Sequence, residues 1–194
     1  KTATVVETPD VKVPFVVEKK VGKITVVVKE YENPDVKVPG ASVTISGNGC
    51  PDKTVTTGTD GTVTVENLPI GDYNVKVNSV PDGYNIVDPD NKDTTVTEGS
   101  NNEVPFAVSK QVGSLKVIVT EKDNDSNKIA NADVTITGNS YSNTVKTGDD
   151  GTVTITKLPV GEYKVVVNSV PGDYNVVAPN EATKKVEENK TTEY

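Results

Sequence analysis

The sequence predicts an all-β protein of two tandem antiparallel β-sandwich domains, with about seven strands each, arranged as a rod. First, residues 62–84 and 152–174 are identical at most positions, which indicates an internal repeat with a period of about 90 residues. Second, apolar and polar residues alternate within short runs, as in half-buried strands. Third, clusters of Gly, Pro, Asn and Asp separate these runs and indicate turns, and no long stretch has helical periodicity.

Composition limits the possible partners. The chain has 194 residues, of which 34% are apolar and 5% aromatic, so each core must be thin and rich in Val and Ile. The net charge is −8, and an acidic surface repels phosphate groups, so we expect no nucleic-acid partner. No apolar run reaches the length of a membrane span, so we expect no membrane insertion in this segment.

Catalysis is not expected. The chain has no His, which excludes His-dependent triads, and its carboxylates form no recognisable acid–base pair. Cys50 is the single cysteine, so it cannot form a disulfide within the chain. We therefore predict that the protein is not an enzyme and has no cofactor, apart from the calcium considered below.

The strands of the first repeat begin at residue 22. In 22–30, Ile24, Val26 and Val28 share one face of the expected strand, and the run 71–78 alternates in the same way. Val, Ile, Thr and Tyr, which dominate these runs, fit a pleated surface.

The turns between the strands carry their own signals. The Asp-Gly pairs of TGTDGT and TGDDGT suit a positive φ at Gly61 and Gly151, and we interpret both turns as hairpin connections. A tighter corner begins at Leu68 and Pro69 and ends at Gly71, and the second repeat has the same corner.

The duplication also predicts the domain boundaries, because residues 13–20 (VPFVVEKK) recur as 104–111 (VPFAVSKQ). We expect three parts: strands matching the end of a preceding repeat at 1–20, a first repeat at 21–111 and a second repeat at 112–194. The alternative frame divides the chain into 1–100 and 101–194. The repeats are joined without a Gly/Ser-rich spacer, which indicates a restricted joint and a rod.

The second repeat stops at Tyr194, where the first repeat has Val104, so its final Val-Pro-Phe strand is missing. A sandwich that lacks an edge strand exposes unpaired backbone and apolar surface. Two arrangements would avoid this exposure. Each domain could begin with its Val-Pro-Phe strand, which we favour, or the N-terminal strand of one molecule could complete the second repeat of another.

Several of these segments resemble a known family. Gly22-x-Ile24-x-Val26, the run GASVTI and the segment TDGTVTVENLPIGDYNVKVNSVPDGY resemble the B-type (Cna-B-like and Sdr-like) repeats of Gram-positive surface proteins. The resemblance covers residues 22–194 and implies a prealbumin-like (transthyretin-like, Ig-like) β-sandwich. It also implies an extracellular location, at the cell surface or attached to the cell wall.

Many members of that family form a spontaneous Lys–Asn isopeptide bond assisted by a buried carboxyl group. This chemistry needs an uncharged Lys amine, an amide carbonyl and a carboxyl group together in an apolar core. The positions that the resemblance implies are occupied here by other residues: Val28 and Val119 for the Lys, Val77 and Val167 for the Glu, and Val108 or Ser109 for the Asn. Lys29 follows the first Lys position and should face outward, so we expect no isopeptide bond of this kind.

One turn resembles the start of a calcium loop, since Asp123, Asp125 and Asn127 follow the pattern D-x-D-x-N. The loop has Lys128 where the turn needs Gly and Val134 where a bidentate Glu is needed. The favoured interpretation is a solvated polar turn, and calcium binding is the alternative.

Tyr31 and Tyr141 are not shared between the repeats, so we regard them as free to contact a ligand. The repeated tyrosines are expected in cores or corners: Tyr73, Tyr84, Tyr163 and Tyr174.

We interpret the chain as a non-enzymatic stalk or spacer of a bacterial cell-surface protein, which projects a functional domain. Its expected partners are other domains of the same protein. The alternative is an adhesin module whose loops bind a host matrix protein or a glycan. The loops differ between the repeats while the framework is kept, which favours the stalk.

Overall fold

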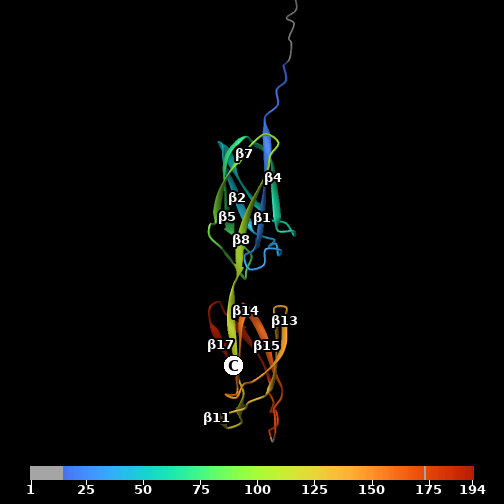
Figure 1. Cartoon of the computed structure of the whole chain (residues 1–194), viewed down its shortest axis with the longest axis vertical. Coiled ribbons are helices and arrows are strands. Elements are labelled where there is room, and N and C mark those ends of the chain that lie inside the picture. Colours follow the sequence, from blue (N-terminus) through green and yellow to red (C-terminus); the bar gives the residue numbers. More distant parts are fainter. Residues whose placement is uncertain (1–14, 173) are drawn as a thin grey trace, which may run out of the picture.

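The computed structural model describes residues 15–172 and 174–194. It contains two β-sandwiches that lie end to end along the long axis of the molecule (Figure 1). The prediction of an all-β fold with tandem sandwiches is therefore confirmed. The part of the chain that the structure describes has no helix long and apolar enough to cross a membrane.

The first sandwich consists of two four-stranded sheets, with strand orders β4-β1-β8-β6 and β3-β2-β5-β7. Its strands are β1 (Val21–Glu30), β2 (Ser42–Gly47), β3 (Cys50–Thr56), β4 (Thr62–Pro69), β5 (Gly71–Ser79), β6 (Tyr84–Ile86), β7 (Asn91–Val96) and β8 (Asn101–Lys110).

The second sandwich repeats this plan with one sheet reduced. Its sheets have the orders β14-β9-β17 and β13-β12-β15-β16, and β10 pairs with β11 as a separate two-stranded ribbon. Its strands are β9 (Val112–Ile118), β10 (Thr120–Glu121), β11 (Asn124–Lys128), β12 (Asp133–Gly138), β13 (Tyr141–Lys146), β14 (Thr152–Pro159), β15 (Gly161–Ser169), β16 (Glu181–Val186) and β17 (Thr191–Glu193).

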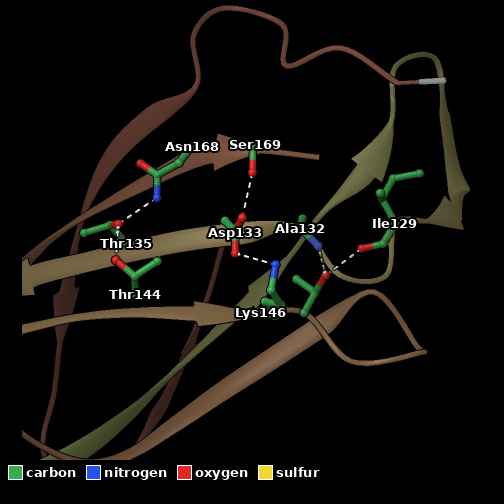
Figure 2. Close-up of polar contacts among 9 residues, drawn as sticks. Ile129, Ala132, Asp133, Thr135, Thr144, Lys146, Asn168 and Ser169 are labelled. Carbon is green, nitrogen blue, oxygen red and sulfur yellow. Dashed lines mark hydrogen bonds and ion pairs between the residues drawn. The ribbon is translucent and has the colours of Figure 1, made fainter. Parts of the chain in front are cut away.

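Period-two alternation explains the core of each sandwich. Ile24, Val26 and Val28 are fully buried, as the pattern in 22–30 predicts, and they pack with the inward residues of β2, β5 and β8. The outer faces are polar. In the second sandwich Asn168 donates to the Thr135 hydroxyl across β12 and β15 at 2.6 Å (Figure 2). Such hydrogen bonds satisfy the solvent side of a sheet whose other side is apolar.

One strand pair in each sandwich is parallel. β8 lies beside β1 in the same direction over eight residue pairs, from Lys23↔Asn101 to Glu30↔Val108. β17 lies beside β9 in the same way over three pairs. A parallel pair requires a long connection between its strands, and here that connection is the remainder of the sandwich.

The Asp-Gly turns have the predicted backbone but a different connection. Gly61 and Gly151 both have a φ of 67°, which confirms the predicted positive values. The interpretation as hairpins is wrong, because the strands that the first turn joins, β3 and β4, belong to different sheets.

A buried threonine explains why the chain crosses between the sheets. The Thr57 hydroxyl accepts from the Ala41 N–H at 3.0 Å and donates to the Val38 carbonyl at 3.1 Å. These bonds tie the end of β3 to the loop before β2, so the next residues leave that sheet. In the second sandwich the equivalent threonine bonds the Ala132 N–H and the Ile129 carbonyl (Figure 2).

The predicted corner after β4 is confirmed. Gly71 has a φ of 146°, and a Cβ there would lie 2.6 Å from the side chain of Asn48, so this position requires Gly. The Tyr73 hydroxyl donates to the Pro69 carbonyl at 3.0 Å and closes the corner. Tyr163 and Pro159 make the same bond at 2.9 Å.

Candidate functional site

The positions implied for the isopeptide chemistry lie inside the sandwiches. Val28, Val77 and Val108 are fully buried in the first core. Val119 is buried in the second core and Val167 is half-buried against it. Alkyl side chains cannot form an amide, and for this reason we predict no such crosslink at these positions. The mass of the intact protein would test this prediction, because each isopeptide bond removes one ammonia.

The calcium candidates lie on the ribbon of β10 and β11. Asp123 occupies the tip with a φ of 65°, and both Asp123 and Asp125 are exposed. The Asn127 amide donates to Glu121 at 2.8 Å, so its nitrogen rather than its oxygen faces the nearest carboxylate. Within residues 15–172 and 174–194, no three Asp, Glu, His or Cys side chains come together as a metal site.

The two tyrosines that we regarded as free differ in their exposure to solvent. Tyr31 follows β1 and is 65% exposed, so it is available for contact. Tyr141 is not free: it packs against the second core and meets the ring of Tyr163 edge-on at 6.3 Å. Tyr141 is equivalent to Cys50, and Tyr163 is equivalent to Tyr73. In the first sandwich the Cys50 Sγ lies 4.0 Å from the Tyr73 hydroxyl, so the residue at this position faces the same tyrosine in both sandwiches.

A buried carboxylate in the first sandwich was not found from the sequence. Glu30 is only 4% exposed, and its Oε1 accepts from the Tyr84 hydroxyl at 2.8 Å and pairs with Lys110 Nζ at 3.0 Å. Burial, together with this carboxylate, raises the pKa of Tyr84 to about 12. The signal in the sequence was a Glu at equivalent positions of the two repeats, Glu30 and Glu121. The three groups tie the end of β1 to β6 and β8.

A groove of about 590 Å³ opens on the second sandwich beside β10 and β11. Both apolar and charged side chains line it. The principal apolar residues are Val119, Ile129, Val167, Tyr174, Val177 and Tyr194. The charged lining residues are Glu121, Lys122, Asp123 and Asp125.

The first sandwich has a strand in the corresponding place. The second half of β8, residues 105–110, lies between β1 and β6 there and buries Phe106 and Val108 in the core. We call residues 105–110 the closing segment. In the second sandwich the pairing of β17 with β9 ends at Glu193, apart from bonds that Tyr194 makes to the backbone. The groove is thus the space that a closing segment fills in the first sandwich.

Residues around the groove show what the closing segment covers. Tyr174 and Val177 are 41% and 54% exposed, whereas Tyr84 and Val87, at the equivalent positions, are half-buried. Residues 174–176 also form no strand, although the equivalent residues form β6. Within the described residues, the edge of the chain at 119–121 has no partner on the side where β8 lies beside β1. In the first sandwich the closing segment supplies the backbone partner at the equivalent edge.

The comparisons with known proteins agree with this fold. A family model described as SpaA, prealbumin-like fold domain, matches residues 22–110 and 115–194. No curated protein sequence matches the chain.

The chain is also similar to several solved structures. The Bacillus anthracis TIE protein matches 90% of this chain at 25% identity with a TM-score of 0.71, and the chain spans 33% of that protein. A streptococcal ancillary pilin is 15% identical, with a TM-score of 0.44 over 92% of this chain and 62% of its own. A minor pilin of Streptococcus agalactiae is 13% identical, with a TM-score of 0.40 over 89% of this chain and 93% of its own.

Proposed function

Because the chain belongs to the SpaA prealbumin-like fold domain family, with one match in each half, we propose that it is a stalk segment of a bacterial cell-surface protein. In this role it holds another domain away from the cell wall and performs no catalysis. Its partners are the neighbouring domains of the same protein. The observation that carries the proposal is the joint between the sandwiches.

The joint consists of a single residue, Gln111, between β8 and β9. Its N–H donates to the Gly83 carbonyl of the first sandwich at 2.8 Å, and its carbonyl accepts from the Val160 N–H of the second at 3.0 Å. Its side chain donates to Asn85 at 2.9 Å, and Asn85 donates to Glu188 of the second sandwich at 2.5 Å. A joint bonded on both sides supports a spacer whose sandwiches keep a fixed relation.

Distances between spin labels on the two sandwiches would test the stalk. In a Cys50→Ser background, Lys53→Cys on β3 and Ser142→Cys on β13 place one label on an exposed position of each sandwich. A stalk predicts one narrow distance distribution. Insertion of a short Gly-Ser stretch after Gln111 is the matched control and should broaden it. An equally broad distribution without the insertion would overturn the proposal.

The adhesin alternative is favoured by one observation, the exposed ring of Tyr31 at the end of β1. Aromatic rings on loops can stack on glycans or anchor a protein interface. Binding to an array of matrix proteins and glycans, with and without calcium, tests this alternative. Saturable binding that Tyr31→Ala abolishes would establish an adhesin, and its absence would leave the stalk.

A further inference from the structure

We propose that the buried carboxylate of Glu30 holds the joint between the two sandwiches in place, by fixing the two strands from which the joint emerges. The residues that do this are Glu30, Tyr84 and Lys110, and we call them the joint brace. The inference rests on the proposed stalk function and deepens it, because it names the group that makes the first sandwich a rigid support for the second.

The joint is attached to the first sandwich at one short stretch of chain. Within the described residues, the hydrogen bonds of Gln111 to the first sandwich all go to β6 and to the glycine before it. Its N–H donates to the Gly83 carbonyl and its side chain to Asn85, and Asn85 donates to Glu188 of the second sandwich. The relation between the sandwiches therefore depends on how firmly β6 is held.

The backbone of β6 holds it weakly. The strand has three residues and lies at the edge of its sheet, so among the described strands it pairs with β8 alone. Its pairing with β8 ends at Tyr84↔Lys110, the last pair before Gln111. Segments with few bonds to the rest of a fold open most easily. A further contact is needed to keep this end of β6 against β8.

The joint brace supplies this contact at the last pair. Glu30 Oε1 accepts from the Tyr84 hydroxyl at 2.8 Å and pairs with Lys110 Nζ at 3.0 Å. One carboxylate oxygen thus bonds both members of the pair, one on β6 and the other on β8. Hydrogen bonds to a charged group are stronger than bonds between neutral groups. Side chains as well as backbone therefore close the pair from which the joint emerges.

Glu30 is a firm anchor, because the backbone around it is itself bonded. Its N–H donates to the Val36 carbonyl at 2.9 Å, and the next N–H, that of Tyr31, donates to the Val108 carbonyl at 2.8 Å. The side chain of Glu30 is buried, so water competes little for its carboxylate. The joint brace thus connects β1, an interior strand of the sheet, to the edge strand that carries the joint.

Stability of the core does not explain a carboxylate at residue 30. A buried ion pair adds little that a well-packed apolar side chain would not add, because both charges must be taken out of water. A carboxylate does add direction, since it accepts hydrogen bonds only from donors at a suitable distance and angle. The choice of Glu therefore favours a role in positioning β6 and β8 over a role in stability.

Spin labels at Lys53→Cys and Ser142→Cys, in the Cys50→Ser background, measure the effect on the joint. Glu30→Met replaces the carboxylate by an apolar side chain of similar length. It should broaden the distance distribution toward that of the Gly-Ser insertion variant. Glu121→Met is the matched control, because Glu121 is the equivalent residue on β10, whose partner β11 lies at the end of the molecule away from the joint (Figure 1). It should leave the distribution narrow.

Hydrogen exchange followed by NMR tests the same step at single residues. In Glu30→Met the Gln111 N–H should exchange with solvent about 10-fold faster, which corresponds to the contribution of one hydrogen bond. The N–H groups of Val26 and Val75, both fully buried in the first core, should exchange no faster than in the unchanged chain. A residue that only stabilised the sandwich would change all of these rates together.

Tyr84→Phe is a second variant, for the case in which Glu30→Met does not fold. It keeps the ring in the core and removes only the hydroxyl that donates to Glu30. We expect the Gln111 N–H to lose protection in this variant too, and the spin labels to report a broader distribution.

Three outcomes contradict the proposal. In the first, both brace variants keep a narrow distribution and a protected Gln111 N–H. In the second, Gln111 and the core N–H groups lose protection equally. In the third, Glu121→Met broadens the distribution as much as Glu30→Met does.

These outcomes are distinguishable from a failure of the stalk function. A narrow distribution in every variant leaves the stalk standing, because the joint is then rigid without the joint brace. A broad distribution in the unchanged chain overturns the stalk instead. In that case the exchange rate of the Gln111 N–H still decides whether Glu30 holds the joint.

Discussion

The two sandwiches share a sequence plan but differ in closure. In the first, Val77 and Val28 are fully buried, and Tyr84 reaches a buried carboxylate. In the second, Val167 is only half-buried and Tyr174 is 41% exposed, although each has the same residue type as its equivalent and is followed by the same residue. The difference arises from the closing segment, which the first sandwich contains and the described second sandwich lacks. Burial at these positions is thus determined by a strand that is distant in sequence.

The largest expected effect concerns the closing segment itself. Phe106→Ala should destabilise the first sandwich by about 3–5 kcal/mol, because it leaves a cavity in a closed core. Urea unfolding, followed by hydrogen exchange at peptide resolution, would report on each sandwich separately. Phe15→Ala removes the same ring from the same motif at an exposed position, so in dilute solution it should change neither sandwich. Equal losses from both variants would contradict the assigned role of the closing segment.

A smaller effect should distinguish the two cores directly. Val77→Ala removes fully buried methyl groups and should cost the first sandwich about 1.5 kcal/mol or more. Val167→Ala removes the same groups beside an open groove and should cost the second sandwich less than about 1 kcal/mol. Differential denaturation of the two variants measures both. If Val167→Ala costs as much as Val77→Ala, the groove is closed in solution.

Alkaline pH should weaken the first sandwich through Tyr84. Its folded pKa, about 12, lies above the ordinary value of about 10, so its stabilising contribution is complete below pH 10 and is lost as the pH rises toward 12. The urea concentration at the midpoint of unfolding of the first sandwich should decrease across this pH range. In Tyr84→Phe this midpoint should depend less steeply on pH. Tyr174→Phe is the matched control in the second sandwich. An unchanged slope in Tyr84→Phe would show that other groups cause the loss.

The smallest expected effect is the contribution of Asp60 and Asp150 to stability at acid pH, which should be equal in the two sandwiches. Hydrogen bonds from the Thr62 hydroxyl and N–H hold the pKa of Asp60 below its usual range, and Thr152 acts in the same way on Asp150. A lowered pKa gives stability that is present above about pH 4 and is lost as the pH falls through the folded value. Asp60→Asn and Asp150→Asn should each make one sandwich slightly less sensitive to acid, by similar amounts in an acid titration of unfolding. Unequal changes would show that the two turns are not equivalent.

Much of the fold could be predicted because its signals are local. Alternation in 22–30 is enough to place Ile24, Val26 and Val28 on the buried face, and Gly61 needs only its own turn to require a positive φ. The partners of strands are not local. The Asp-Gly turn has the sequence of a hairpin, but the buried hydroxyl of Thr57 fixes β3 to an earlier loop and sends β4 to the other sheet.

The candidate sites could be predicted only in part. The alignment of Tyr194 with Val104 indicated where the second repeat lacks a strand, although we favoured a frame in which each domain begins with its Val-Pro-Phe strand. The groove lies beside Tyr194. Glu30 could not be recognised as buried, because its partners come from β6 and β8, far along the chain. Tyr141 was misjudged since its lack of a tyrosine counterpart says nothing about the ring that it meets. The boundaries 1–20, 21–111 and 112–194 stay a prediction.

The parallel pairing of β1 and β8 has a consequence for a chain under tension. One strand begins the first sandwich and the other ends it, so a pull on the two ends of the sandwich drags them in opposite directions along their common axis. The hydrogen bonds of all eight residue pairs then carry the load together, in shear, whereas a hairpin pulled open loses its bonds one after another. The equivalent pair of β9 and β17 is also parallel, so its three residue pairs are loaded in the same shear geometry.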